Sequence, residues 1–275
     1  MNCFQLIKTV LDEAYEAIPG TKPEREASVS ASLKSLSKDY ASLTKTGCLD
    51  YRKPCRRFAY IFRYTTSHAN IVYQLIESSK ILSKVFDSKK VLISCVGGGP
   101  GSDFLGILKY CQSAKKSPEV KCLLLDRDPA WGESWSDVDD KVGSKMRLST
   151  VFNSFDVTDP DQWSTFTKHF QADLFTLIYF MSEVYALRTK ADSYFNALMS
   201  SMQKGALMLF VDNNDSRFVD WFDGLAKTNG LKVLEQGSGT LTMPMDENKK
   251  DLEPYFTKFG HPKLQADVAW RVVQK

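Results

Sequence analysis

From residue 90 onward, short apolar runs alternate with longer amphipathic segments, and this alternation restricts the possible folds more than any other feature. The runs have the length and apolar content of buried strands, and they cover 90–96, 120–128, 149–159, 172–185, 205–215, 231–237 and 267–275. Helix-like segments between them cover 102–112, 132–146, 159–170, 188–202 and 216–230. Strands that alternate with helices form a parallel sheet with helices on both faces. We therefore predict a seven-stranded, mostly parallel α/β sheet, whose last two strands can pair antiparallel at an edge.

Residues 1–88 contain no convincing strand. Apolar residues at helical spacing, such as Phe4, Ile7 and Leu11, predict a first helix, which the Gly- and Pro-containing stretch 19–25 ends. A Ser- and Lys-rich helix to about Thr46 and an amphipathic stretch over 58–86 follow. We therefore predict an N-terminal helical cap over 1–88 and a second domain over 89–275.

The composition places few limits on partners. Thirty-six Lys and Arg residues against 33 Asp and Glu residues give a net charge of +3, which does not by itself indicate a nucleic-acid-binding protein. No apolar run approaches the ~20 residues that cross a bilayer, and acidic residues interrupt the start of the chain, where a secretory signal needs an apolar core. The six cysteines form no CxxC pair and the three histidines lie far apart, so we expect neither disulfides nor a zinc site. These features predict a soluble cytoplasmic or nuclear protein without membrane contact.

The sequence GGGPG (97–101) directly follows the first apolar run and precedes a helix-like segment. In an open parallel sheet, ligands bind at the carboxyl ends of the strands, beside the first crossover. Residues without side chains let a ligand approach the backbone, and a helix N-terminus offers free N–H groups to an anion. The loop lacks the Gly-Lys-Ser/Thr of a nucleoside-triphosphate loop, and Ser102 stands where a dinucleotide fingerprint needs its third glycine. A glycine turn that only packs the helix on the strand is the structural alternative.

Downstream of this loop come a strand ending in an acid (KCLLLD), a third strand with SFDVTD, and the segment FMSEV. This order resembles the class I S-adenosylmethionine-dependent methyltransferases over about 88–275. The resemblance implies a Rossmann-like sheet with an antiparallel last strand, methyltransferase activity, and S-adenosyl-L-methionine as cofactor bound by the domain 89–275. The candidate cofactor-binding residues are Gly97, Gly98, Gly99, Gly101, Asp103, Asp126, Arg127, Asp156, Val157, Phe180 and Met181.

The resemblance assigns a role to each group of candidates. The loop glycines would approach the methionine part of the cofactor, and Asp126 would accept hydrogen bonds from the ribose hydroxyls, as a carboxylate can. Asp156 would lie near the adenine amino group with Val157 beside the ring, and Arg127 would border the adenosine. The alternatives are an exposed loop acid for Asp126 and a helix cap for Asp156.

One position departs from the family. An acid usually stands two residues before the first loop glycine, where it holds the methionine ammonium group. Here Cys95 occupies that position. Asp103, in the first turn of the following helix, is a candidate substitute, although an acid is favourable there in any helix.

The segment after the fourth strand matches the part of the family that faces the sulfonium and the acceptor. It begins with Phe180, Met181 and Ser182, and Glu183 and Tyr185 are our candidate catalytic, acceptor-facing residues. The alternative for Glu183 is an ordinary helix-start acid. Methyl transfer needs mainly in-line alignment, and a base only where the acceptor carries a proton.

The acceptor itself is open. Residues 51–76 combine five Arg and Lys residues with interleaved aromatic residues and no acid, a composition typical of an RNA-contacting surface. The alternative is an apolar core stripe with a solvated basic face. We favour RNA slightly as acceptor, ahead of a small molecule or a protein. A hypothesis of another class is a non-catalytic module that keeps the fold and perhaps the cofactor, which Cys95 favours.

Overall fold

The computed structural model describes residues 2–46, 49–142, 148–243 and 247–275. The described residues form one seven-stranded sheet with the order β3-β2-β1-β4-β5-β7-β6. Its strands are β1 (Lys90–Val96), β2 (Glu119–Asp126), β3 (Leu148–Ser154), β4 (Leu174–Ile178), β5 (Leu207–Asn213), β6 (Lys232–Thr242) and β7 (Gln265–Gln274). Strands β1 to β5 run parallel, whereas β7 is antiparallel to both β5 and β6. The predicted Rossmann-like, mostly parallel sheet with an antiparallel last pair is confirmed.

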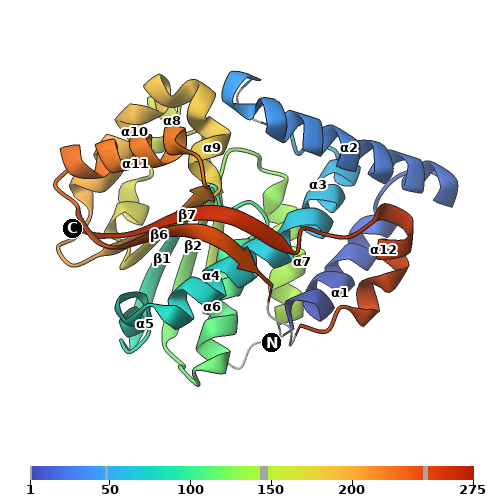
Figure 1. The fold of residues 1–275 in the computed structure, drawn as a ribbon, viewed down its shortest axis with the longest axis horizontal. Coiled ribbons are helices and arrows are strands. Elements are labelled where there is room, and N and C mark those ends of the chain that lie inside the picture. Colours follow the sequence, from blue (N-terminus) through green and yellow to red (C-terminus); the bar gives the residue numbers. More distant parts are fainter. Residues whose placement is uncertain (1, 47–48, 143–147, 244–246) are drawn as a thin grey trace.

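The sheet separates two hydrophobic clusters. Strand β5 shows the separation residue by residue, since Leu207 and Leu209 belong to one cluster and Met208 and Phe210 to the other. This is the alternation that a strand buried on both faces must show. The second cluster lies against the helices α8 (Pro160–Trp163), α10 (Arg188–Ser201) and α11 (Ser216–Thr228), which Figure 1 shows together above the sheet.

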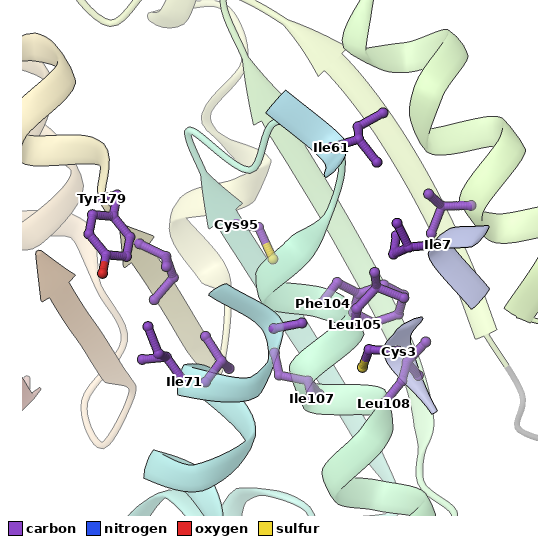
Figure 2. Close-up of a cluster of buried hydrophobic side chains, with 14 of the residues drawn as sticks. Cys3, Ile7, Ile61, Ile71, Cys95, Phe104, Leu105, Ile107, Leu108 and Tyr179 are labelled. Carbon is purple, nitrogen blue, oxygen red and sulfur yellow. The ribbon is translucent and has the colours of Figure 1, made fainter. Parts of the chain in front are cut away.

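The first cluster contains the helices that precede the sheet. They are α1 (Cys3–Glu16), α2 (Lys22–Thr46), α3 (Pro54–Tyr60), the π-helical turn η1 (Ile61–Thr65), α4 (Thr66–Ser78) and α5 (Lys80–Val85). The cluster also contains α6 (Ser102–Ser113) and α7 (Trp131–Val142). Figure 2 shows Cys3 and Ile7 of α1 in the same cluster as Leu105 and Leu108 of α6. The division into a cap (1–88) and a methyltransferase-like domain (89–275) stays a prediction, because the helices on both sides of residue 88 share this one core.

A glycine lets α4 approach α6 closely. A Cβ atom at Gly106 would lie 2.3 Å from the carbonyl oxygen of Ala69 and 2.8 Å from the Cβ of Val72. A buried polar group connects the same region, in which Lys109 Nζ donates to Asn70 Oδ1 at 2.7 Å and forms an ion pair with Glu247. The N-terminal helices are therefore packed directly on the first crossover helix.

Three local predictions are wrong or incomplete. The strand predicted over 172–185 ends at Ile178, because Tyr179 adopts a left-handed conformation (φ 57°) and α9 (Phe180–Val184) follows. The helix predicted over 159–170 is only the short α8 and the 3₁₀ turn η2 (Thr167–Gln171). The connection between β6 and β7 contains a turn, η4 (Lys250–Leu252), and a helix, α12 (Glu253–Phe259), that we did not predict. The end of the helix predicted over 132–146 lies outside the described residues.

The remaining short element is the 3₁₀ turn η3 (Tyr185–Leu187). Among the described helices, none combines the length and the apolarity that a membrane span requires.

Candidate functional site

The glycine loop joins β1 to α6 at the carboxyl end of the sheet, and it folds back on the neighbouring strand β2. The N–H groups of Gly97 and Gly98 both donate to the carbonyl oxygen of Leu125, at 2.8 and 3.0 Å. Gly97 has a φ of 70°, and a Cβ atom there would lie 2.0 Å from the ring of Phe180. Since a left-handed conformation and this contact both exclude a side chain, only glycine fits at position 97.

The other loop glycines are also explained by their neighbours. Gly101 has a φ of 82°, and a Cβ atom there would lie 2.3 Å from the indole of Trp135. A Cβ atom at Gly98 would lie 3.0 Å from the side chain of Leu124. The close packing of helix on strand, which was the structural alternative, therefore accounts for part of the glycine cluster.

Asp126 ends β2 and is tied to the loop. Its Oδ2 accepts a hydrogen bond from the N–H of Gly99 at 3.0 Å, and its Oδ1 accepts one from the N–H of Asp128 at 3.1 Å. Burial raises the pKa of Asp126 to about 6, although these two hydrogen bonds oppose the shift. Each carboxylate oxygen can accept a second hydrogen bond, so this side chain can still receive donors from a ligand.

A small cavity of about 40 Å³ lies at this edge of the sheet. We call it the first cavity. Its lining residues are Leu49, Tyr51, Val96, Gly97, Leu125, Asp126, Arg127, Asp128, Phe155, Asp156, Val157, Phe180, Glu183 and Val184. Seven residues predicted from the sequence as cofactor-binding or catalytic thus line one cavity, namely Gly97, Asp126, Arg127, Asp156, Val157, Phe180 and Glu183.

Other predicted residues lie elsewhere. Asp103 is 1% exposed, and its carboxylate accepts a hydrogen bond from Thr176 Oγ1 behind the loop. Met181 is fully buried in the second hydrophobic cluster. Tyr185 packs edge-on against Phe218 and Trp221. The structure does not bring these three candidates into the first cavity, and Gly98, Gly99 and Gly101 do not line it either.

Cys95 is turned away from the cavity as well. It is fully buried, and its Sγ lies 3.6 Å from the Sγ of Cys122 on the neighbouring strand. Burial raises the pKa of the Cys95 thiol well above its ordinary value. Figure 2 shows this side chain within the first hydrophobic cluster, where it acts as a small apolar residue.

The segment between α2 and α3 contributes residues that sequence reasoning missed. The N–H of Tyr51 donates to Asp128 Oδ2 at 2.9 Å, and Arg127 Nη2 donates to the carbonyl oxygen of Leu49 at 3.0 Å. These two hydrogen bonds hold the segment against the end of β2. The residues they join are 77 or more positions apart in the sequence, and no local pattern indicates such pairs.

Glu183 lies on α9, at the wall of the first cavity, and contacts α2. The hydroxyl of Tyr40 donates to Glu183 Oε1 at 2.8 Å and lies 2.9 Å from the hydroxyl of Tyr51. Burial, with smaller contributions from Asp126 and Asp212, raises the pKa of Glu183 to about 8, although the Tyr40 hydrogen bond opposes the shift. A carboxyl group with such a pKa can exchange a proton near neutral pH. Tyr40 was not among the predicted residues.

A second cavity, of about 260 Å³, lies on the other side of Tyr40. Its lining residues are Tyr40, Ala41, Leu43, Thr44, Tyr64, His68, Tyr179, Ser182, Asn213, Asp215, Arg217, Phe218 and Lys263. Beneath it, the N–H of Ser182 donates to Asp212 Oδ2 at 2.8 Å, which anchors α9 to the end of β5. Glu183, its neighbour Ser182 and Tyr40 thus place the two cavities next to each other.

The aromatic residues of 51–76 do not form the predicted stacking surface. Tyr51, Phe58, Tyr60 and Phe62 are buried, because they pack in the first hydrophobic cluster. The cations are engaged too. Arg56 Nη2 donates to Asp39 at 2.7 Å, and Arg57 Nη1 donates to the carbonyl oxygens of Tyr51 and Arg52 at 3.1 and 2.8 Å. Internal packing therefore accounts for most of the aromatic residues of this segment, and RNA contact through 51–76 stays a prediction.

The strand order, the antiparallel β7 and the position of the first cavity define the fold of the class I S-adenosylmethionine-dependent methyltransferases. No protein-family model matches the chain, and no curated protein matches it either. The likeness to known proteins is one of three-dimensional structure.

Three solved structures illustrate this likeness. A proposed RNA methyltransferase from Pyrococcus horikoshii is 14% identical, with 87% of this chain and 98% of that one covered, at a TM-score of 0.47. A SAM-dependent methyltransferase from Methanosarcina mazei is 9% identical, with 72% and 97% covered, at a TM-score of 0.45. An O-methyltransferase family protein from Burkholderia thailandensis is 12% identical, with 88% and 70% covered, at a TM-score of 0.49. At these identities the likeness concerns the fold alone.

Proposed function

We propose that this chain is an S-adenosyl-L-methionine-dependent methyltransferase. The observation that carries the proposal is the first cavity, where a strand-end carboxylate tied to a glycine loop, an apolar slot and a partly buried glutamic acid of raised pKa meet. The fold positions these residues, and the chemistry of the lining residues supports the proposal that they bind S-adenosyl-L-methionine.

The lining fits the nucleoside half of the cofactor. Asp126 would accept hydrogen bonds from the ribose hydroxyls. Phe155 and Val157 would contact the adenine ring, and Asp156 would accept a hydrogen bond from the adenine amino group. Burial also raises the pKa values of Asp126 and Asp212 to about 6. A cationic ligand lowers the cost of ionising such buried carboxyl groups, so the site favours a positively charged molecule.

Fewer residues of the first cavity can be assigned to the methionine half of the cofactor. Neither Cys95 nor Asp103 lines the first cavity, so we assign the ammonium group to neither residue. The ring of Phe180 lies on Gly97, where the loop would approach the methionine part. We propose that Phe180 borders the methionine chain and that the approach to the loop backbone is at Gly99, where a Cβ atom would have no neighbour nearer than 3.9 Å.

When bound, the cofactor supplies a methyl group on a sulfonium, which an acceptor nucleophile displaces. Glu183 would take the acceptor proton in its ionised form, which predominates only above about pH 8 because burial raises its pKa. The hydroxyl of Tyr40 holds this carboxylate from α2 at 2.8 Å. We propose no catalytic role for Tyr185, whose ring packs against Phe218 and Trp221.

The acceptor is proposed to enter the second cavity, which α2 borders with Tyr40, Ala41, Leu43 and Thr44. This position favours a small molecule over RNA, which the sequence slightly favoured. A protein side chain is the alternative of similar size.

Calorimetric titration with S-adenosyl-L-methionine tests the proposal. We expect binding, and we expect Asp126→Ala to weaken it by about 1.5–3 kcal/mol, or roughly 10- to 150-fold, because a hydrogen bond to a charged group is lost. Asp220→Ala, at an exposed position of α11, is the matched control and should bind as the wild type does. Wild-type affinity in Asp126→Ala would contradict the ribose assignment, and no binding by the wild type would contradict the proposed function.

A non-catalytic S-adenosylmethionine-binding module is the second candidate. The replacement of the strand-end acid by Cys95, buried against Cys122, favours it. Transfer of tritiated methyl groups into RNA, protein and metabolite fractions separates the two functions. Cofactor binding without transfer into any fraction would favour the module.

A further inference from the structure

We propose that the second cavity binds the methyl acceptor as a small aromatic molecule with an anionic group, and that Lys263 pairs with this anion. The inference rests on the proposed function, whose acceptor site it specifies. Three independent features of the cavity carry it, namely its aromatic wall, its unpaired cation and its position beside Glu183.

The aromatic wall is a continuous stack. The rings of Tyr64 and His68 are stacked at 5.7 Å, and those of His68 and Tyr179 at 4.2 Å with an interplanar angle of 16°. Burial lowers the pKa of His68 to about 3, so this ring is neutral at physiological pH. Planar apolar faces of this kind contact an aromatic ligand favourably.

Tyr179 adds a polar feature to this wall. It is held in the left-handed conformation (φ 57°), and its buried hydroxyl has no hydrogen-bond partner among the described residues. A strained non-glycine residue and an unsatisfied buried hydroxyl both cost free energy in the ligand-free protein. A ligand with an oxygen acceptor would satisfy the hydroxyl.

Of the two basic residues that line the second cavity, one has no ion pair among the described residues. Arg217 forms an ion pair with Asp215, and both line the cavity. Lys263 is half-buried, its Nζ lies 5.2 Å from the centre of the Tyr179 ring, and it has no ion pair within the described part of the chain. Burial and the nearby Arg63 lower the pKa of Lys263, and the nearby Asp212 raises it. An anionic ligand would compensate this unpaired charge, whereas a neutral one would not.

The backbone fixes the position of this lysine. The N–H of Lys263 donates to the carbonyl oxygen of Arg63 at 2.9 Å, and Arg63 Nη1 donates to the carbonyl oxygen of His261 at 3.0 Å. The segment before β7 is thereby joined to the turn η1, which precedes His68. These contacts fix the backbone from which the Lys263 side chain extends to the ring of Tyr179.

The cavity also leads to the base. Tyr40 and Ser182 line it, and Tyr40 donates to Glu183 at 2.8 Å. With the anion held at Lys263, a hydroxyl group elsewhere on the aromatic molecule would face Tyr40, whose hydroxyl donates to Glu183. Its oxygen would form the bond to the methyl carbon, its proton would pass to the Glu183 carboxylate, and the sulfur would retain the electron pair of the broken bond.

Binding without cofactor tests the inference separately from methyl transfer. We would titrate the full chain calorimetrically with 4-hydroxybenzoate, 4-hydroxycinnamate and salicylate, and with the amide of each acid, which keeps the ring and hydroxyl but removes the charge. We expect at least one acid to bind about 10-fold or more tightly than its amide, as a charge-assisted hydrogen bond provides. Lys263→Gln should remove this preference, and Lys204→Gln, an exposed lysine outside the lining, should keep it.

The outcomes separate the two proposals. Equal binding of acid and amide, an unchanged preference in Lys263→Gln, or no binding of any acid would overturn the inference, even where S-adenosyl-L-methionine binds. Methyl transfer into RNA or protein without acid binding would overturn it as well. Unchanged S-adenosyl-L-methionine affinity in Lys263→Gln would show that the substitution leaves the fold and the first cavity intact.

Discussion

Replacement of Glu183 by glutamine should make the protein more stable at alkaline pH, and the gain should disappear in acid. Burial raises the pKa of Glu183 in the folded protein from 4.5 to about 8. The groups that face it are Tyr40 on α2, Asp126 and Arg127 at the end of β2, and Asp212 at the end of β5. Glutamine has nearly the same shape and still accepts the Tyr40 hydrogen bond, but it cannot ionise.

The sign and size follow from proton linkage. Between pH 4.5 and about 8, the folded protein keeps a proton on Glu183 that the unfolded chain has lost. The free energy of unfolding therefore falls as the pH rises through this interval, and it levels off above it. At 1.36 kcal/mol per pKa unit, the shift corresponds to roughly 5 kcal/mol, and partial solvent access at the cavity wall reduces this figure. We expect Glu183→Gln to exceed the wild type by about 2–5 kcal/mol above pH 8.

Urea unfolding of both proteins across this pH range measures the difference, with Glu235→Gln on the edge strand β6 as the control. The shifted carboxyl groups Asp126 and Asp212 are present in both proteins, so their contributions largely cancel. A difference that is independent of pH, or a loss of stability in Glu183→Gln at high pH, would refute the claim that Glu183 is held protonated by burial.

Two further substitutions test neighbouring contacts. Tyr40→Phe removes the hydrogen bond that favours the ionised carboxylate, so the stability gain of Glu183→Gln should level off about 1–2 pH units higher in this background; an unchanged pH dependence would argue against the bond. Gly106→Ala places a Cβ atom 2.3 Å from a backbone oxygen of α4, and we expect a loss of about 1–3 kcal/mol in urea unfolding. Gly224→Ala, on α11 with open space around it, should instead gain about 0.5–1 kcal/mol; similar effects of the two glycine substitutions would contradict the packing argument.

The substitution of the strand-end acid has a structural counterpart. Cys95 and Cys122 lie on adjacent strands and fill the space between the sheet and α6 with sulfur. Asp103, which begins α6, is also directed into this interior and binds Thr176. The strand-end acid of the family pattern is therefore absent here, whereas Asp126 and Asp156 line the first cavity.

The sequence alone predicted the parts of the molecule that depend on local pattern. The pattern of apolar residues predicted the seven strands and showed that most of them alternate with helices. The glycine run marked the loop at the end of β1, and the acids that follow β2 and β3 marked two walls of the first cavity. These predictions hold because parallel strands bring their carboxyl ends to one edge, whatever the loops between them contain.

The tertiary structure alone decided what faces those walls. Aromatic residues interleaved with arginines look the same in sequence whether they are exposed or buried, and packing placed Phe58 and Phe62 in the core. The contact of Tyr40 with Glu183 joins residues 143 positions apart, and the second cavity depends on where α2 crosses α9. No periodicity along the chain predicts contacts between residues so far apart in the sequence, because these contacts depend on how the helices pack against the sheet.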